Sequence, residues 1–355
     1  MYFCGVKILE FDMRKLWLLL ILLCVCAMMW AQRDSCNLLF SFYNVENLYD
    51  PENDSLFRDD DFTPEGSYHW TYGKFLKKVN NIAKVLIIMG DGVPPDIAAM
   101  AEVENDLVFQ RFCYHSPLKK FNYGYVHFDS PYLRGVETGL LYRKDRLQII
   151  HKEAIAVVFP FEPATKNRDI LYVVAKTCCG DSLHVFVNHW TSRYGGYGAT
   201  VPKRNYYAQV LRHWVDSLLV RDPSAKIIIM GDFNDYPTDE SVSRMLGASD
   251  MTKTDTASLY NLMYKFLKMN NIGTHKHEDF WGCLDQIIVS PALLDSTVTG
   301  VHVVGSEAHI FKEDFMVEPD EKYGGYKVFR TFLGPRYIGG YGDHLPVFIK
   351  LKTEN

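Results

Sequence analysis

The sequence has little that would indicate a disulfide-stapled or cysteine-ligated protein. Three of its eight cysteines lie within the first 26 residues. The other five are an odd number without the paired spacing of zinc sites. The cysteines therefore predict neither a disulfide framework nor a metal centre.

Positive charge is also scarce. Lysine and arginine number 38 against 43 aspartates and glutamates, which gives a net charge of -5, and no long basic run is present. A protein that binds duplex DNA through bulk electrostatics is usually basic. Composition therefore argues against such a protein, and a nucleic-acid substrate would need a local recognition patch.

The sequence also lacks internal repeats and any linker rich in Ser, Pro or Gly. Apolar residues make up 48% of it and aromatic residues 14%, which is typical of a globular protein with a large core. We therefore expect one domain over residues 37–355.

The first residues have the pattern of an export signal. Met13-Arg14-Lys15 supplies positive charge, residues 16–31 are uncharged and mostly apolar, and Ala31 is a small residue at the end. This order predicts a signal peptide over residues 1–31, with Met13 as an alternative start. The protein would then be periplasmic or secreted and have no membrane span after cleavage. The alternative is an uncleaved anchor formed by residues 16–31.

Helical and strand-like patterns alternate after residue 37. Apolar residues recur at helical spacing over 72–88 and again between Tyr206 and Leu219. Runs rich in β-branched and aromatic residues predict strands. They cover 38–43, 96–103, 139–142, 149–159, 170–177, 183–188, 227–230, 284–289 and 345–351. This pattern predicts a mixed α/β domain.

Polar residues follow several of these strands directly. In the run from Lys226 to Asp235, a buried strand ends in Gly231, and Asp232 and Asn234 follow two residues apart, on one side of the extended chain. Other strands lead into similar residues. These are Asn44 and Glu46, Glu102, His189, Asp285, and Asp343 with His344. Ligands in α/β proteins gather at strand ends, and this set suits a divalent cation and a phosphate.

These residues stand in motifs that resemble one known family. The motifs are YNVENL with Asn44, AEVEN with Glu102, NHWTSR with His189, GDFND with Asp232 and Asn234, LDQIIVS with Asp285, and GDHLPV with Asp343 and His344. Their order is similar to that of the endonuclease/exonuclease/phosphatase superfamily, over residues 38–351. The chain departs from many members at Ala101, where glutamine is common, and at Glu46, where some nucleases have a shorter acid.

The resemblance implies a four-layer α/β sandwich of two packed, mostly antiparallel β-sheets flanked by helices. It also implies hydrolysis of a phosphate ester by in-line water attack, assisted by Mg²⁺ or Mn²⁺. Glu102 would be the principal metal ligand, with Asn44, Glu46 and Asp343 as further or alternative contributors. We expect the protein to be a monomer with a single catalytic domain.

The resemblance further implies the catalytic roles. Asp232 would orient or deprotonate the attacking water, and Asn234 would hold the water and the phosphate. His344, oriented by Asp285, and His189 would stabilise charge on the phosphoryl group or act in proton transfer.

Further residues are candidates for substrate contacts. Arg193 and Arg168 could fork onto a phosphate, and Tyr341 could stack on a base or sugar. Asn47 is either a substrate contact or a turn residue. The segment from His275 to Glu278 carries zinc-type ligands, but no partner pair is evident in the sequence, so we predict no metal site there.

The sequence thus predicts an exported phosphodiesterase, with an endonuclease as the first choice. The alternatives are a sphingomyelinase-like lipid phosphodiesterase, a small-molecule phosphomonoesterase, and a binding module that keeps the fold without the chemistry.

Overall fold

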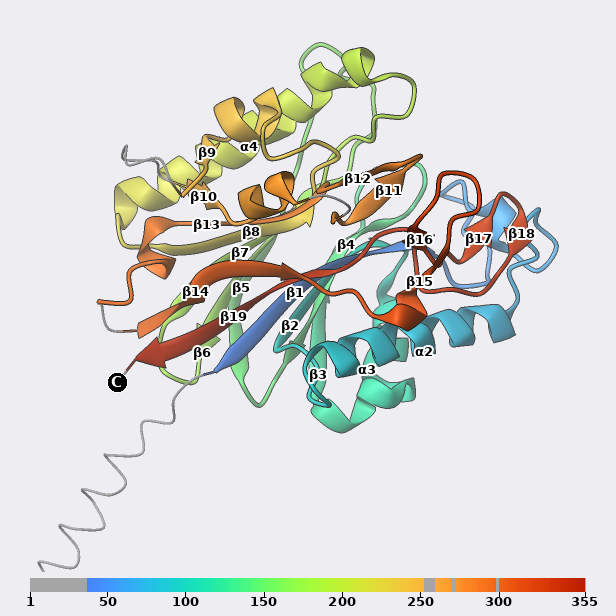
Figure 1. The fold of residues 1–355 in the computed structure, drawn as a ribbon, viewed down its shortest axis with the longest axis horizontal. Coiled ribbons are helices and arrows are strands. Elements are labelled where there is room, and N and C mark those ends of the chain that lie inside the picture. The colour runs from blue at the N-terminus through green and yellow to red at the C-terminus, as the bar shows by residue number, and fades with distance from the viewer. Residues whose placement is uncertain (1–36, 252–258, 270–271, 298–299, 355) are drawn as a thin grey trace, which may run out of the picture.

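The computed structural model describes residues 37–251, 259–269, 272–297 and 300–354. The expected signal peptide lies outside these residues. Two β-sheets pack face to face at the centre, and helices cover their outer faces (Figure 1). The four-layer sandwich predicted from the sequence is therefore confirmed.

One sheet has six strands in the order β14-β19-β1-β2-β4-β3. Only β1 and β2 pair in parallel, and the other pairs are antiparallel. The strands are β1 (Leu38–Leu48), β2 (Ile97–Val103), β3 (Tyr123–His127), β4 (Glu137–Arg143), β14 (Gly300–Ile310) and β19 (Val347–Glu354).

The second sheet has seven strands in the order β5-β6-β7-β8-β13-β10-β9. The pairs β7–β8 and β9–β10 are parallel, so β1, β2, β7 and β8 all present their C-terminal ends at one end of the sandwich. The strands are β5 (Leu147–Ile155), β6 (Ile170–Thr177), β7 (Ser182–His189), β8 (Lys226–Asp232), β9 (Ala248–Ser249), β10 (Leu259–Asn261) and β13 (Asp285–Val289).

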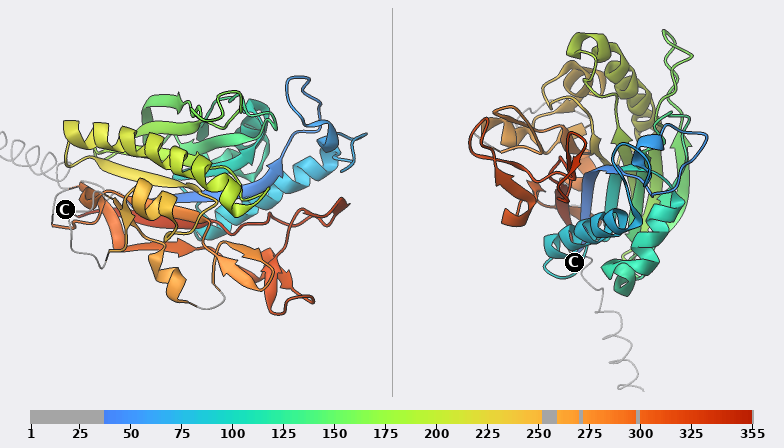
Figure 2. Two further views of the ribbon diagram at one scale, coloured as in Figure 1. Left: turned by 90° about the horizontal axis from the view of Figure 1, so that it is seen from above. Right: turned by 90° about the vertical axis from the view of Figure 1, so that its right-hand side faces the viewer.

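In the described part of the chain, three α-helices flank the sheets. Helices α2 (Tyr72–Met89) and α3 (Asp106–His115) cover the six-stranded sheet, and α4 (Tyr197–Arg221) covers the seven-stranded sheet on the opposite side (Figures 1 and 2). The pattern over 72–88 predicted α2 closely. Helix α4 begins nine residues before Tyr206, and α3 was not predicted, because its ten residues are too few to show a clear period.

Short elements make up the rest of the described chain. Three hairpins project near the strand ends that carry polar residues: β11 (His275–His277) with β12 (Phe280–Gly282), β15 (Val317–Pro319) with β16 (Tyr326–Val328), and β17 (Phe332–Leu333) with β18 (Arg336–Tyr337). The short helical turns are η1 (Asp60–Phe62), η2 (Pro117–Phe121), η3 (Ser241–Met245), η4 (Tyr264–Lys268), η5 (Pro291–Leu293) and η6 (Asp314–Met316).

The apolar core lies in three layers. The central layer joins the facing sides of the two sheets, where Phe40 and Ile97 meet Val185 and Ile287. The outer layers lie under α2 and α3 and under α4. Burial of both faces of each sheet explains why central strands such as β8 are continuous apolar runs. Among the described residues, no helix is long and apolar enough to cross a membrane.

Candidate active site

Glu102 occupies an irregular end of β2. The pairing of β2 with β4 shifts between Ala101 and Val103, and Glu102 itself has a φ of 63°. On the neighbouring strand, Glu46 and Asn47 have φ values of 55° and 49°. Such left-handed conformations cost residues other than glycine about 1–3 kcal/mol each and cluster at functional sites. Here they aim the Asn47 amide at Glu102, which accepts its hydrogen bond at 2.8 Å.

Cationic groups surround the Glu102 carboxylate. Arg134 donates to the Asn47 side chain, and the Nε2 atom of His189 lies 3.8 Å from Glu102 Oε1. Burial opposes ionisation, but the charge of Arg134, with a smaller contribution from Arg168, outweighs it and holds the pKa of Glu102 at about 2. Glu102 is therefore an anion throughout the physiological range and is suited to bind a cation.

Asp232 terminates β8 on the opposite sheet. Its position requires Gly231, because a Cβ atom there would lie 2.3 Å from the carbonyl oxygen of Asn188 on β7. The Asp232 carboxylate accepts hydrogen bonds from the Asn234 amide at 2.9 Å and from Asn44 Nδ2 at 3.1 Å. Asn44 lies on β1, so this last bond ties the two sheets together at the site.

Both predicted histidines face Asp232. The Nε2 atoms of His189 and His344 lie 3.7 Å and 3.9 Å from Asp232 Oδ2. Burial raises the pKa of Asp232 to about 6, although the charge of His344 opposes this shift. Burial also moves the pKa of His189 well below its usual value, and the nearby Arg168 adds to the effect. The two histidines thus differ in the protonation state that their surroundings favour.

His344 and Asp285 form the expected pair. The Nδ1 atom of His344 lies 2.6 Å from Asp285 Oδ2, and both residues are buried. Burial disfavours a charged imidazole, but Asp285, Asp232 and Asp343 together raise the pKa of His344 well above its ordinary value. This bond orients the ring so that Nε2 points toward Asp232. The hydroxyl of Thr274 holds the Asp285 amide at 3.1 Å and thereby fixes the start of β13.

Asn234 lies beside Asp232 in a tight turn. It has a φ of 51°, and its side-chain Nδ2 donates to the Trp190 carbonyl at 3.1 Å. Arg193 supports the same turn, because its guanidinium donates to the Asn234 carbonyl at 2.7 Å and to Asp239 at 2.6 Å. The structure thus assigns the Arg193 donors to the loop around the site.

Glu46 and Asp343 are linked by a residue that the sequence did not reveal. Arg330 donates to Glu46 Oε1 at 3.2 Å and to Asp343 Oδ2 at 2.9 Å. The second Glu46 oxygen accepts the Thr331 amide at 2.7 Å, and buried Lys78 donates to the Glu46 carbonyl. Arg330 stands in an aromatic, glycine-containing stretch without a recognisable motif, so no sequence signal indicated it.

Two other predicted substrate contacts are buried and bonded to other parts of the chain. Tyr341 is buried in the outer core, where its ring packs 5.0 Å from that of Phe315 and its hydroxyl accepts from Lys84. Arg168 is also buried, donates to the Val136 carbonyl at 3.0 Å, and stacks 3.8 Å over the Tyr132 ring. Arg168 still contributes positive charge near Glu102 and His189.

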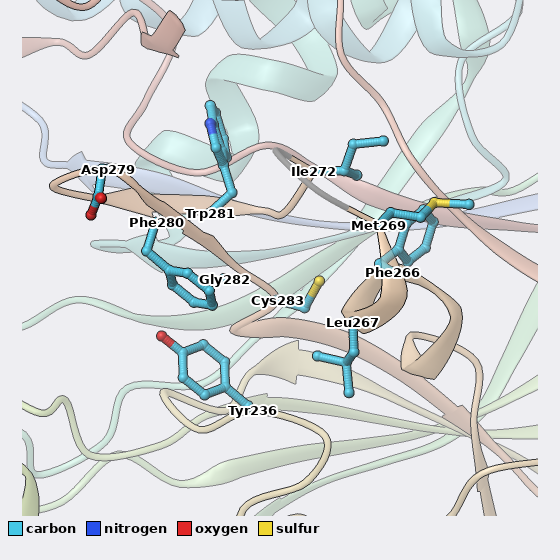
Figure 3. Close-up of a pocket in the computed structure, with 10 residues that line it drawn as sticks. All are labelled: Tyr236, Phe266, Leu267, Met269, Ile272, Asp279, Phe280, Trp281, Gly282 and Cys283. Carbon is cyan, nitrogen blue, oxygen red and sulfur yellow. The ribbon is translucent and has the colours of Figure 1, made fainter. Parts of the chain in front are cut away.

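A pocket of about 340 Å³ is lined by residues that neighbour two of these strand ends in the sequence. Figure 3 shows Tyr236 and Phe280 on one side, Leu267 and Met269 on the other, and Cys283 between them. Tyr236 follows Asn234 by two residues, and Cys283 precedes Asp285 by two. The walls of the pocket therefore continue directly from two of the strand ends that carry the polar cluster.

The donor groups around Glu102 fit a hard divalent cation. Mg²⁺ needs one or two protein carboxylates and keeps several waters. Glu102 is ionised, and its side chain remains 14% exposed. Both oxygens of Glu46 are already engaged, and the side-chain oxygen of Asn44 accepts the Glu46 amide at 3.1 Å. Glu102 is thus the carboxylate of this group that is suited to hold Mg²⁺ or Mn²⁺.

Comparisons with solved structures agree with the fold. An endonuclease/exonuclease/phosphatase family protein from Bacteroides thetaiotaomicron is similar at a TM-score of 0.55 and 18% identity, with 90% of this chain and 96% of that chain covered. A mannosyl-6-phosphatase from the same organism matches at 0.55 and 18%, covering 88% and 99%. D. rerio TDP2 in complex with a single-strand DNA product matches at 0.53 and 16%, covering 89% and 99%.

At these identities the solved structures show the fold. A comparison with curated proteins gave no significant match. The family model described as "Endonuclease/Exonuclease/phosphatase family", however, matches residues 39–353. This match spans both sheets and every residue of the polar cluster, and the chain therefore belongs to the endonuclease/exonuclease/phosphatase family.

Proposed function

We propose that the protein is a divalent-metal-dependent phosphodiesterase that hydrolyses its substrate by in-line attack of water. One observation carries this proposal. Two carboxylates, the partly exposed Glu102 and the buried Asp232, face the same histidine from opposite sheets, at 3.8 Å and 3.7 Å, and their pKa values are shifted in opposite directions. Such divergence is typical of sites where one carboxylate binds charge and the other transfers a proton.

The proton-transfer role falls to Asp232. With a pKa near 6 it is ionised at neutral pH, yet it is basic enough to accept a proton from water as the water oxygen bonds to phosphorus. The backbone amide of Asn234 donates a hydrogen bond to Asp232 Oδ1. This leaves Oδ2 directed toward the histidines and Asn44. Asp232 thus both orients and deprotonates the nucleophile.

The histidines stabilise the negative charge that develops on the phosphoryl group. His344 is held protonated by three carboxylates and can donate from Nε2 to a phosphoryl oxygen. His189, which burial keeps neutral, can donate a hydrogen bond from the ring nitrogen that carries its proton. The ester P–O bond breaks, the leaving oxygen takes up a proton from solvent water, and Asp232 returns to solvent the proton that it removed from the nucleophile. Removing one such donor costs about 10²–10³ in rate.

Glu102 would hold Mg²⁺ or Mn²⁺, which supplies Lewis-acid neutralisation of the phosphate oxygens. Asn44 would act indirectly. Its side chain donates to Asp232 and accepts from the backbone amide of Glu46, which adjoins the Asn47 amide that binds Glu102. Asp343, held by Arg330, would contribute from the outer side of the cleft. We propose no direct role in metal binding for Glu46.

An endonuclease is our first choice of substrate class, because the aromatic walls formed by Tyr236 and Phe280 can accept a base next to the scissile phosphate. A lipid phosphodiesterase is the second candidate. It is favoured by the exposed apolar side chains Leu267, Met269, Ile272 and Phe280 at the same pocket. A phosphomonoesterase, such as the mannosyl-6-phosphatase neighbour, would make little use of this pocket.

We also propose that the protein is exported through cleavage after residues 1–31 and works as a monomer with one catalytic domain. Export would place the enzyme in the periplasm or outside the cell. N-terminal sequencing of the mature protein tests the cleavage site, and light scattering tests the monomer.

The central experiment measures hydrolysis of bis(p-nitrophenyl) phosphate with Mg²⁺ or Mn²⁺, with and without a chelator. We expect turnover that requires the metal. A panel of single- and double-stranded DNA, RNA, sphingomyelin, inositol phosphates and nucleotides then identifies the substrate. Pure, folded protein that is inert on the whole panel with both metals would favour a binding module instead.

A further inference from the structure

A second group of potential metal ligands includes His344. One donor atom each from His275, Asp343 and His344 lies within 4.8 Å of the other two. The rings of His275 and His344 are 4.7 Å apart between centroids. His275 comes from the segment whose zinc-type ligands had no evident partner in the sequence, and the fold supplies those partners from residues 343 and 344.

The backbone fixes this group in place. His275 and His344 form an antiparallel β-bridge, and the amide of Leu345 donates to the Thr274 carbonyl at 2.7 Å. The hairpin of β11 and β12 therefore carries its histidine to the segment that precedes β19 (Figure 1). Ligands on paired strands are held more precisely than ligands on loops.

Two of the three ligands also have partners that orient them. Asp285 accepts from His344 Nδ1 at 2.6 Å, which leaves Nε2 as the donor atom to a metal. Arg330 binds Asp343 Oδ2 at 2.9 Å, and Oδ1 lies 3.9 Å from His344 Nε2. Carboxylate–histidine pairs of this kind accompany most metal-binding histidines and raise the basicity of the ligand.

The chemistry of these donors selects the class of metal. Two imidazoles and one carboxylate suit first-row transition metals such as Zn²⁺, whereas Mg²⁺ prefers oxygen ligands. Zn–N and Zn–O bonds of about 2.0–2.2 Å bring neighbouring donors closer than 4.8 Å, so a small closure of the side chains completes the site. The alternative group of Asp232, Asp285 and His344 fits less well, because Asp285 and His344 already bond to each other.

We propose that His275, Asp343 and His344 form a transition-metal site, and that Zn²⁺ bound there inhibits the enzyme by displacing the Nε2 proton of His344 to solvent and taking its place. The inhibition rests on the proposed function, in which the same atom donates to the phosphoryl group. Binding of Zn²⁺ to the resting protein does not rest on it.

Calorimetry with Zn²⁺ and the visible absorption of bound Co²⁺ test binding directly. The Glu102→Gln variant removes the proposed Mg²⁺ ligand and should still bind one Zn²⁺. His275→Asn should weaken Zn²⁺ binding by at least about 100-fold, since loss of a mere outer partner costs about 10–100-fold. His277→Asn, on the same hairpin, is the matched control and should leave the affinity unchanged.

Hydrolysis assays test the consequence. Zn²⁺ should inhibit the Mg²⁺-supported activity of the wild type, and His275→Asn should relieve that inhibition without lowering activity in the absence of Zn²⁺. Absence of Zn²⁺ binding to the wild type, or equal losses of affinity in His275→Asn and His277→Asn, would overturn the site. If His275→Asn does not fold, Asp343→Asn replaces it in the binding assay, and unchanged Zn²⁺ affinity there would also overturn the site. Normal binding without inhibition would overturn only the regulatory part.

Discussion

The two sheets contribute the two halves of the site, and their carboxylates differ in a way that residue type does not explain. Glu102, on the six-stranded sheet, is surrounded by Arg134, His189 and Arg168 and keeps a pKa of about 2. Asp232, on the seven-stranded sheet, is buried next to Asp285, and burial raises its pKa to about 6. The arginines favour a permanent anion on one side, and burial favours a weak base on the other. The neighbours of a carboxylate therefore set its pKa.

The largest effect on activity is expected when each of the two carboxylates is replaced by its isosteric amide. We expect Asp232→Asn to lower kcat/KM by about 10³-fold, within the range of general acid–base catalysis. Glu102→Gln should cause a similar loss at low Mg²⁺, but higher Mg²⁺ should partly restore it. Rates measured over a Mg²⁺ titration check both effects. Rescue of Asp232→Asn but not of Glu102→Gln would reverse the two roles.

A smaller loss of activity is expected from a change in Asp285, the second carboxylate that the seven-stranded sheet contributes to the site. Asp285→Asn removes the anion that orients His344 at 2.6 Å and stabilises its charge. We expect kcat to fall by about 10²-fold and the pKa of His344 to decrease. An NMR titration of the histidine signals measures that pKa separately from turnover. An unchanged His344 pKa would mean that Asp285 acts only in folding.

The role of the six-stranded sheet in metal binding can be tested at Arg134, whose positive charge lies near Glu102. Arg134→Met removes the charge that contributes most to keeping Glu102 ionised. The pKa of Glu102 should rise, and the affinity for Mg²⁺ or Mn²⁺ should fall by about 10–100-fold, as for other outer-sphere changes. Calorimetric titration of Mn²⁺ measures this loss, with Arg111→Met on α3 as a control that should change nothing. Equal metal affinity in wild type and Arg134→Met would separate Arg134 from the site.

The smallest expected effect is a displacement of the pH profile. Asp232 must lose its proton to act as a base, so kcat/KM should rise as pH increases through about 6. The Asn44 hydrogen bond favours the ionised carboxylate, so Asn44→Ala should raise the pKa of Asp232 and move this limb to higher pH. Profiles of kcat/KM measured at saturating metal check the direction. A limb that moves to lower pH would contradict the assignment.

Local patterns predicted most of the core elements. The helical period over 72–88 gave α2, and the apolar run before Asp232 gave β8, because burial imposes a regular pattern on long elements. Strand β14 was not predicted, because its centre from Val304 to Glu307 is exposed except at Ser306 and interrupts the apolar pattern. The beginning of α4 was also missed, because its first turns contain Gly198 and Pro202.

The site was predictable where a residue stands in a motif at a strand end. Asn44, Glu102, His189, Asp232 and His344 are brought together as the sequence indicated, since parallel strands present their ends at one edge. Arg134, Arg330 and Lys78 were not found. They lie outside motifs and reach the site only through the folding of distant segments.

The sequence by itself determined the family, the two-sheet fold and the identity of the polar strand ends, because these depend on periodicity and on the order of short motifs. The tertiary structure alone decided in which direction the pKa of each carboxylate is shifted, since a pKa depends on burial and on charges from remote parts of the chain. It also decided that Arg193 supports a loop, that Tyr341 is buried, and that His275 lies beside His344. These outcomes depend on which distant backbone segments the two sheets bring into contact.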